Sequence, residues 1–372
     1  MLSIDEVLTR GVEQILPSRE GLKELMGKKK IRLYLGIDPT ATRLHLGHTV
    51  MLRKLQQFAD LGHETILLFG TGTVLVGDPS QREKGRKLIT QKEIDQNIAT
   101  WKEQVKPIID FKKVKIKYNG DWLTKLSLKE LIQIASNISA VQLFKREMFQ
   151  RRLDKGDTVW YHETMYPLLQ GYDSVAMNVD LELGGTDQTF NMLIGRELQQ
   201  KINHHEKFVL AGKMIMGTDG KPMSKTSGNC IWLTDTAFDM FGKLMSINDS
   251  LMPDYFEFFT DLNMPEGEPL AVKKQLALTI TSKYHGQAKA AEAQTNFATT
   301  FQRKTPAFDQ TVKGQGILAS TIAPLVGSSS QAKRLIDQKA VDLNGKTITT
   351  FDHPVKKEDK IKVGKKIFVT VV

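Results

Sequence analysis

Residues 30–48 read KIRLYLGIDPTATRLHLGH and join a short apolar run to a polar turn and the beginning of a helix. Residues 30–37 are typical of a strand, whereas residues 44–62 carry apolar side chains at helical spacing. Two further short runs, ETILLF at 64–69 and VKIKY at 114–118, also predict strands. Short strands separated by helical stretches predict βαβ units around a parallel sheet, so we expect an α/β fold.

The segments that follow the first two predicted strands are 38–48 and 71–80, and both contain glycines and polar side chains. Parallel sheets bind ligands beyond the carboxyl ends of their strands, close to helix N-termini. We therefore expect both segments in one binding site.

The pattern changes further along the chain. Residues 234–301 show successive helical stretches without strand-like runs, and a polar break follows. The last segment predicts two helices, STIAPLVG and QAKRLIDQKA, and then strands in VDLNGKTI and IKVGKKIFVTVV. We expect three domains: an α/β body over 1–226, a helical domain over 227–310 and a small basic α+β domain over 311–372.

Composition and charge narrow the class of protein. The 372 residues are 40% hydrophobic and 25% charged, and no apolar run is long enough to span a membrane. The N-terminus, MLSIDEVLTRGVEQIL, has acids where a signal peptide needs bases and apolar residues at helical spacing. The single cysteine, Cys230, cannot form an internal disulfide, so we expect a cytoplasmic protein. The net charge of +10 favours a polyanionic partner, although many proteins are as basic without one.

The motif HLGH at 45–48 begins the helix that follows the first predicted strand. Gly47 removes a side chain where a nucleotide could approach, and the imidazoles of His45 and His48 can donate hydrogen bonds to phosphate oxygens at a helix N-terminus. A pair of structural histidines, or half of a metal site, would have the same spacing. Since no Cys, His or Glu set with ligand spacing stands nearby, we expect no protein-ligated metal.

The motif KPMSKT at 221–226 follows the turn GTDG. The glycines of the turn, with the serine and two lysines of the motif, predict a mobile basic loop that can close over a triphosphate, where ammonium groups meet the charge that grows on departing pyrophosphate. A solvated basic turn is the alternative interpretation.

Together the two motifs resemble the HIGH and KMSKS motifs of class I aminoacyl-tRNA synthetases. Four segments in the same order, LYLGIDPTATRLHLGH, LVGDPS, YPLLQGYDS and LGGTDQTFN, resemble the bacterial tyrosyl-tRNA synthetase family over nearly the whole chain. The resemblance implies a Rossmann-like catalytic domain that uses ATP to convert tyrosine to tyrosyl-adenylate, with release of pyrophosphate. The tyrosyl group then passes to the 3′-terminal adenosine of tRNA(Tyr).

The resemblance also implies the residues that bind tyrosine. Tyrosine differs from phenylalanine by one hydroxyl, so selection requires polar groups that stay unsatisfied without it. Tyr34 matches the donor to the phenol oxygen, and Asp173 matches the acceptor of the phenol proton. The other tyrosine-binding positions, around the ammonium and carboxylate groups, are Asp78, Tyr166, Gln170 and Gln188. Spacing places Tyr166, Gln170 and Asp173 on one helix face.

The residues implied for ATP fall into groups that contact its different parts. The phosphate side is matched by Gly36, Asp38, Thr40, His45, Gly47 and His48. The ribose is matched by Gly184, Gly185 and Asp187, and backbone groups at adenine by Met214 and Ile215. The catalytic set comprises His45, His48, Lys225 and a pyrophosphate clamp of Arg82 and Arg86. Mg²⁺ is expected to arrive with ATP.

Two positions depart from the family pattern. Pro222 stands where KMSKS begins with lysine, and the nearest upstream lysine is Lys221. Glu182 precedes LGGTDQ where many family members carry glutamine, and its role stays open.

The last domain resembles a small RNA-binding module shared with a ribosomal small-subunit protein. Residues 311–372 hold eleven Lys and Arg residues and five acids, a net charge of +6. Lys333, Arg334 and Lys339 are expected to face tRNA phosphates, although a generic basic tail would look similar. The family implies a homodimer, for which residues 141–153 are a candidate contact.

Three alternatives remain for the function. A tryptophan enzyme would share the fold, but an indole has no hydroxyl for Tyr34 and Asp173. A regulatory RNA-binding protein could retain this body without activity. A small-molecule nucleotidylyltransferase shares the HxGH motif but leaves the basic tail and GGTDQ unexplained.

Overall fold

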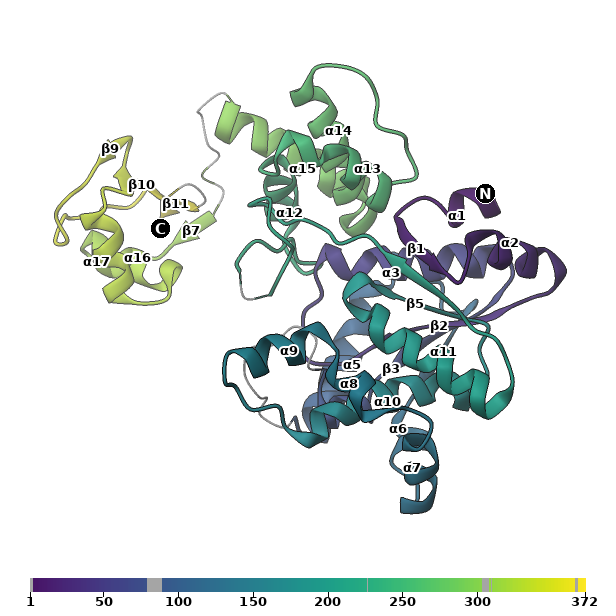
Figure 1. Ribbon diagram of the computed structural model, residues 1–372. Helices are drawn as coiled ribbons and strands as arrows, with labels where there is room; N and C mark the ends of the chain where they lie inside the picture. The colour runs from purple at the N-terminus through teal and green to yellow at the C-terminus, as the bar shows by residue number, and fades with distance from the viewer. Residues whose placement is uncertain (1–2, 79–88, 226, 303–307, 309, 365–366) are drawn as a thin grey trace. The chain divides into compact units, whose positions relative to one another are not determined.

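The computed structural model describes residues 3–78, 89–225, 227–302, 308, 310–364 and 367–372. The predicted pyrophosphate clamp, Arg82 and Arg86, lies outside the described residues. The chain divides into two compact units, 1–290 and 291–372, which are described separately (Figure 1).

A six-stranded sheet forms the centre of the first unit. Its strand order is β1-β6-β5-β2-β3-β4, with β2 to β6 parallel and β1 antiparallel at one edge. The strands are β1 (Val12–Leu16), β2 (Arg32–Ile37), β3 (Glu64–Phe69), β4 (Val114–Tyr118), β5 (Leu181–Gly185) and β6 (Phe208–Gly212). The three predicted strands are confirmed as β2, β3 and β4, and the predicted α/β class is confirmed with them.

Helices surround this sheet in the first unit (Figure 1). Those before β5 are α1 (Ile4–Val7), α2 (Arg19–Lys28), α3 (Leu46–Asp60), α4 (Thr73–Val76), α5 (Gln91–Val105), α6 (Gly120–Leu123), α7 (Leu128–Ala135), α8 (Ala140–Phe144), α9 (Glu147–Asp154) and α10 (Tyr161–Met177). The short helix η1 (Thr186–Gln188) leads into α11 (Thr189–Asn203). The backbones of α10 and α11 approach closely, because a Cβ on Gly171 would lie 3.1 Å from the nitrogen of Gly195.

The helical stretch predicted over 234–301 is confirmed. It contains α12 (Ala237–Met245), η2 (Asp249–Leu251), α13 (Met252–Phe259), α14 (Pro269–His285), α15 (Gln287–Phe297) and η3 (Ala298–Gln302). The apolar residues of the N-terminal segment have helical spacing, but the structure forms a helix only over α1. The helix ends at Val7, and the strand β1 follows. Pairing with β6 holds β1 extended. Among the described residues, no helix is both long and apolar enough to cross a membrane.

The second unit contains a five-stranded sheet of order β7-β11-β10-β8-β9. Its elements are β7 (Gln310–Val312), α16 (Leu318–Val326), α17 (Ser329–Asp337), β8 (Val341–Leu343), β9 (Lys346–Thr347), β10 (Lys360–Val363) and β11 (Ile367–Val371). Buried side chains from both helices and the sheet, Ile322, Ile336, Ile361 and Val369 among them, form a core of its own. The two helices and the later strands agree with the sequence prediction, and β7 is additional.

Candidate active site

The carboxyl ends of the parallel strands carry the predicted site residues. Asp38 directly follows β2 and accepts hydrogen bonds from Thr73 Oγ1 (2.7 Å) and Tyr166 Oη (3.0 Å). Gly70 directly follows β3, and a Cβ there would lie 1.9 Å from Asp38 Oδ1. The segments after β2 and β3 therefore meet at one edge of the sheet, as the sequence predicts.

One face of α10 completes this edge. Tyr166, Gln170 and Asp173 all lie on α10, one turn or slightly less apart. Tyr166 contacts Asp38, and Gln170 Nε2 donates to Glu182 Oε1 at 3.0 Å. The predicted helix face is thus turned toward the strand ends.

Asp173 is buried, with 2% of its surface exposed. Its carboxylate accepts from Asn119 Nδ2 (3.0 Å) and Trp122 Nε1 (2.9 Å). Burial raises the pKa of Asp173, and the two donated hydrogen bonds oppose that rise by favouring the charged form. Sequence reasoning did not select Asn119 or Trp122, although both follow β4 at the same sheet edge.

Tyr34 lies on β2 and is fully buried. Its hydroxyl shares a hydrogen bond of 3.1 Å with Ser174 Oγ. Burial raises the pKa of Tyr34 well above its usual value, so its hydroxyl keeps its proton at neutral pH.

Asp78 and Gln188 lie in contact at the other side of the site. Gln188 Nε2 donates to Asp78 Oδ2 at 2.8 Å, and Asn191 Nδ2 donates to both Gln170 Oε1 and Gln188 Oε1 at 3.0 Å. Arg146, which sequence reasoning missed, directs a terminal nitrogen to 3.7 Å from Asp78 Oδ1.

Arg146 is an unusual cation for this position. It is buried, and its two terminal nitrogens have no hydrogen-bond partner within the described part of the chain. Burial lowers the pKa of its guanidinium group, and the nearby Asp78 opposes that shift. A charge-rich stretch such as FKREMFQRR offers no sequence signal that separates Arg146 from its solvated neighbours.

The HLGH motif begins α3, as predicted, with His45 as its N-cap residue. The His45 and His48 rings lie 3.8 Å apart. Burial, followed by the charge of Lys225, lowers the pKa of His45 to about 4, and burial also lowers that of His48. His45 Nδ1 is buried and has no hydrogen-bond partner among the described residues. A Cβ on Gly47 would lie 3.0 Å from the His45 ring.

The KPMSKT loop lies beside the same site. Lys225 Nζ is 3.4 Å from Thr40 Oγ1, which brings the two predicted ATP-binding residues together. Asn229 holds the loop, since its side chain accepts from the Ser224 amide (3.0 Å) and donates to Asp219 (2.8 Å). Lys221 is exposed.

The remaining predicted ATP-binding residues lie at the ends of β2, β5 and β6. Gly36 is near the end of β2, Gly184 and Gly185 end β5, and Asp187 accepts from Gln188 Nε2 at 3.1 Å. Met214 is exposed, whereas Ile215 is buried and its carbonyl accepts from the Met223 amide at 2.8 Å. Within the described residues, no group of three His, Cys, Asp or Glu side chains could hold a metal ion.

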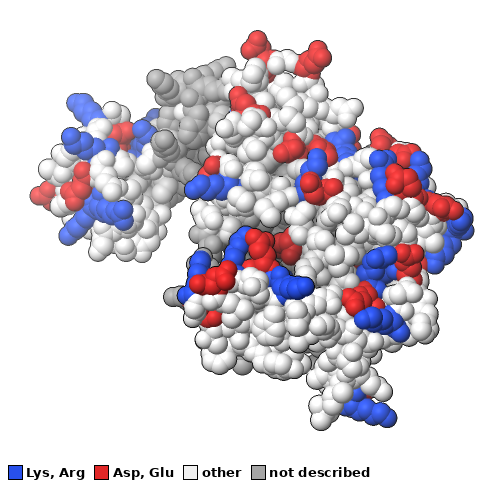
Figure 2. Space-filling view, viewed as in Figure 1, with Lys and Arg blue, Asp and Glu red and all other residues white. Residues whose placement is uncertain are grey.

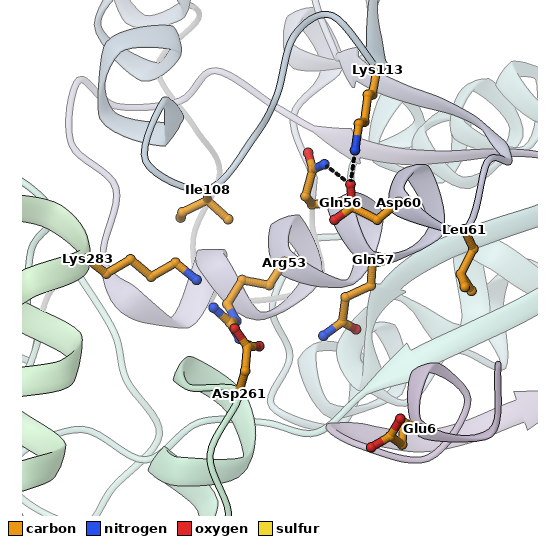
Figure 3. Close-up of a pocket in the computed structure, with 10 residues that line it drawn as sticks. All are labelled: Glu6, Arg53, Gln56, Gln57, Asp60, Leu61, Ile108, Lys113, Asp261 and Lys283. Atoms are coloured by element: carbon orange, nitrogen blue, oxygen red, sulfur yellow. Dashed lines mark hydrogen bonds and ion pairs between the residues drawn. The ribbon is translucent and has the colours of Figure 1, made fainter. Parts of the chain in front are cut away.

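A hollow of about 500 Å³ lies elsewhere in the first unit (Figure 3). Arg53 on α3 is ion-paired there with Asp261 at 2.6 Å, and Asp60 with Lys113 at 2.6 Å. Its lining residues include none of the predicted site residues. Three acidic and three basic side chains line it, four of them in these two ion pairs, so its chemistry does not select a ligand of either charge.

The predicted RNA-binding residues lie in the second unit. Lys333 and Arg334 are exposed on α17, and Lys339 follows that helix with φ of 56°. Figure 2 shows both basic and acidic side chains on the visible face of this unit. Lys333 Nζ also lies 5.8 Å from the centre of the Phe351 ring.

The sequence matches a known family over most of its length. The family described as "tRNA synthetases class I (W and Y)" matches residues 26–302. A protein named "Tyrosine--tRNA ligase 2" from Vibrio cholerae is 40% identical over 94% of this chain and 93% of its own length. A "Tyrosine--tRNA ligase" from Colwellia psychrerythraea is 41% identical over 92% of this chain and 91% of its own.

Solved structures show a similar fold. A C-terminally truncated mitochondrial tyrosyl-tRNA synthetase of Aspergillus nidulans superposes with a TM-score of 0.68 at 21% identity, covering 80% of this chain and 94% of its own. A tyrosyl-tRNA synthetase of Archaeoglobus fulgidus, solved with L-tyrosine, gives 0.62 at 20% identity, covering 78% of this chain and all of its own.

Proposed function

The chain belongs to the class I tRNA synthetases of tryptophan and tyrosine, and from that premise we propose how its residues carry out the reaction. It is a tyrosine–tRNA ligase, an enzyme that activates tyrosine with ATP and transfers the tyrosyl group to tRNA. The assignment of each step to particular side chains follows from the contacts at the strand ends.

The phenol end of tyrosine is proposed to lie between Tyr34 and Asp173. Both side chains are buried, and Asn119 and Trp122 hold the Asp173 carboxylate in place, each donating to one of its oxygens. Tyr34 donates to the phenol oxygen, and Asp173 accepts the phenol proton. Bound phenylalanine would leave both groups unsatisfied, which is costly in a buried site. This pair of buried polar groups is the observation that supports tyrosine as the substrate.

The ammonium and carboxylate groups of tyrosine are proposed to lie at the opposite end. Asp78, Tyr166 and Gln170 surround the ammonium group. Gln188 and Arg146 both contact the Asp78 carboxylate, Gln188 by a hydrogen bond and Arg146 by an ion pair. Both side chains are therefore placed to meet the negatively charged carboxylate of tyrosine. Because this carboxylate must approach the α-phosphate, the buried Arg146 cation beside it reduces the repulsion between the two anions.

ATP is proposed to lie across the start of α3 and the KPMSKT loop. His45 and His48 donate to phosphate oxygens as neutral imidazoles, and this role is supported by His45 Nδ1, which has no hydrogen-bond partner in the described part of the chain. Lys225 lies close to Thr40 and meets the charge on pyrophosphate. Around the nucleotide we place the other predicted residues: Gly36, Asp38, Gly47, Gly184, Gly185, Asp187, Met214, Ile215, Arg82 and Arg86. Mg²⁺ is proposed to enter on the phosphates.

The reaction needs no covalent intermediate on the protein. The tyrosine carboxylate attacks the α-phosphate in line, and pyrophosphate leaves. A hydroxyl of the terminal ribose of tRNA then attacks the acyl carbon and releases AMP. The protein accelerates both steps by positioning the reactants and by stabilising developing charge.

We further propose an organisation around this site. Residues 1–226 form the catalytic domain, 227–310 a helical domain and 311–372 an RNA-binding domain that presents Lys333, Arg334 and Lys339 to tRNA(Tyr). Exposed apolar side chains on α7 and α8, among them Leu128, Ile132 and Val141, support a homodimer. We propose a cytoplasmic location, since the protein aminoacylates tRNA and its cysteine is a buried free thiol.

Amino-acid-dependent ATP–pyrophosphate exchange tests the site. Exchange is measured with tyrosine, phenylalanine and tryptophan on the wild type and on Tyr34→Phe. We expect tyrosine alone to stimulate exchange well in the wild type. Tyr34→Phe should lower kcat/KM for tyrosine by about 10–100-fold and leave that for phenylalanine nearly unchanged, because only tyrosine loses a hydrogen bond. Equal losses for both amino acids would refute the assignment of Tyr34.

A further inference from the structure

Lys207 and Glu182 form an ion pair in the interior of the first unit. Their side chains are 0% and 2% exposed. Glu182 lies on β5 directly opposite Tyr34 on β2, and Lys207 immediately precedes β6. Gly195 leaves the space for the ammonium group, because a Cβ there would lie 2.6 Å from Lys207 Nζ. The free-energy cost of removing two charges from water offsets most of the attraction in such a buried pair. A contribution to stability alone therefore does not explain why the pair is present.

The ion pair contacts both ends of the proposed tyrosine site. Lys207 Nζ donates to Ser174 Oγ at 2.9 Å, and Ser174 shares its 3.1 Å hydrogen bond with Tyr34. Glu182 Oε1 accepts from Gln170 Nε2 at 3.0 Å. The phenol-binding Tyr34 and the ammonium-binding Gln170 therefore depend on one buried anchor.

The hydroxyl of Ser174 has a single proton to donate. Lys207 donates into Ser174 Oγ, so that proton must point to Glu182 or to Tyr34. Glu182 Oε2 is 3.4 Å away and already accepts from Lys207, whereas the Tyr34 oxygen is nearer, at 3.1 Å. Ser174 Oγ can therefore donate to either oxygen, and turning its proton to the nearer one, that of Tyr34, frees the Tyr34 proton. The proton of Tyr34 is then available for an acceptor on the substrate.

We propose that the Lys207–Glu182 ion pair is a positioning device for substrate selection. Through Ser174 it fixes Tyr34 as a hydrogen-bond donor toward the phenol oxygen of bound tyrosine. Donation then runs in one direction, from the Lys207 ammonium through Ser174 and Tyr34 to the substrate. The inference rests on the proposed site, and it gives Glu182 the role that its departure from the family glutamine left open.

The test measures exchange with tyrosine and with phenylalanine on Ser174→Ala and on the double variant Glu182→Gln/Lys207→Met. The double variant removes both buried charges together, so it leaves neither uncompensated. We expect each to lower the tyrosine-to-phenylalanine ratio of kcat/KM by about 10–100-fold, with KM for ATP unchanged. Combining Ser174→Ala with the double variant should add little further loss, since all three residues act through one hydrogen bond to Tyr34.

A second buried ion pair provides a matched control. Arg152 and Glu163 are 6% and 9% exposed, and the other hydrogen bonds of their side chains within the described structure go to the backbone of Thr158 and Trp160. Arg152→Met/Glu163→Gln should lower the Tm but keep the ratio of tyrosine to phenylalanine. Should Glu182→Gln/Lys207→Met fail to fold, Ser174→Ala decides the matter, because it keeps the ion pair.

The outcomes separate this inference from the proposed function. If Tyr34→Phe collapses the ratio while Ser174→Ala and the double variant both leave it unchanged, the positioning role is wrong and the site stands. If tyrosine and phenylalanine lose activity equally in these variants, the ion pair is merely structural. If Tyr34→Phe itself leaves the ratio unchanged, the proposed phenol site is wrong.

Discussion

The protonation of His45 follows from its surroundings. Burial and Lys225 lower its pKa to about 4, so the imidazole is neutral at pH 7. As a hydrogen-bond donor to a phosphate whose charge grows in the transition state, it should contribute about 2.7–4 kcal/mol. We predict that His45→Ala lowers the rate of tyrosine-dependent exchange by roughly 100–1000-fold, by a similar factor at pH 6.5 and at pH 8.

The same shift has a consequence for stability. The folded chain resists protonation of His45, whereas the unfolded chain binds that proton near pH 6.5. This group therefore lowers the free energy of unfolding as pH falls from 6.5 toward 4, and it has no effect above 6.5. Urea unfolding between pH 4.5 and pH 7.5 should show a shallower pH dependence for His45→Gln than for the wild type. Identical slopes would contradict the buried neutral imidazole.

Arg146 gives a prediction that depends on one group of the ligand. Tyrosinol keeps the phenol and ammonium groups of tyrosine but lacks the carboxylate. We expect Arg146→Gln to weaken tyrosine binding by about tenfold or more and tyrosinol binding little, as measured by calorimetry, because only tyrosine loses a charged partner. Arg146→Lys should recover part of the loss. A similar loss for both ligands would show that Arg146 only supports Asp78.

At the residue scale, the sequence predicted the positions that lie in short motifs and missed those that act from outside them. His45 and Lys225 belong to spaced patterns with a chemical reason, and the structure brings both to one edge of the sheet. Arg146, Asn119 and Lys207 lie in ordinary contexts. Only the fold brings them to the site, so no local pattern could identify them.

At the scale of elements, the local sequence pattern decides which strands could be predicted. β3 and β4 are isolated apolar or alternating runs that follow helices, and both were predicted. β5 and β6 end in glycine, at Gly185 and Gly212, a residue that is depleted in strands, so their pattern is weak. β1 shares its spacing with a helix and becomes a strand only by pairing with β6.

Helices α7 and α8 carry apolar side chains on their exposed faces. Val141 on α8 is 64% exposed, although Leu143 on the same helix is buried. If this face is the dimer contact, Val141→Asp places a charge in it and should shift the molecular mass measured by light scattering toward that of one chain. Leu270→Asp on α14 is a matched control at another exposed apolar residue and should leave the mass unchanged. A dimer that persists in Val141→Asp would exclude this face.

At the scale of the whole molecule, the basic residues of the second unit should matter for tRNA and not for adenylate formation. The substitution of Lys333, Arg334 and Lys339 by alanine is expected to weaken tRNA binding and leave exchange unchanged. Each lost phosphate contact lowers the slope of log affinity against log salt by about 0.7–0.9, so the slope should fall by roughly 2. Replacing Lys23, Lys28 and Lys106 in the first unit removes the same charge and should not change the slope.

The last strand of the chain, β11, lies between β7 and β10 in its sheet. Deleting residues 367–372 would therefore take away hydrogen bonds on two sides and open the unit's apolar interior to solvent. The shortened unit should be cleaved faster than the intact unit in limited proteolysis. For the same reason, an affinity tag should replace none of these six residues.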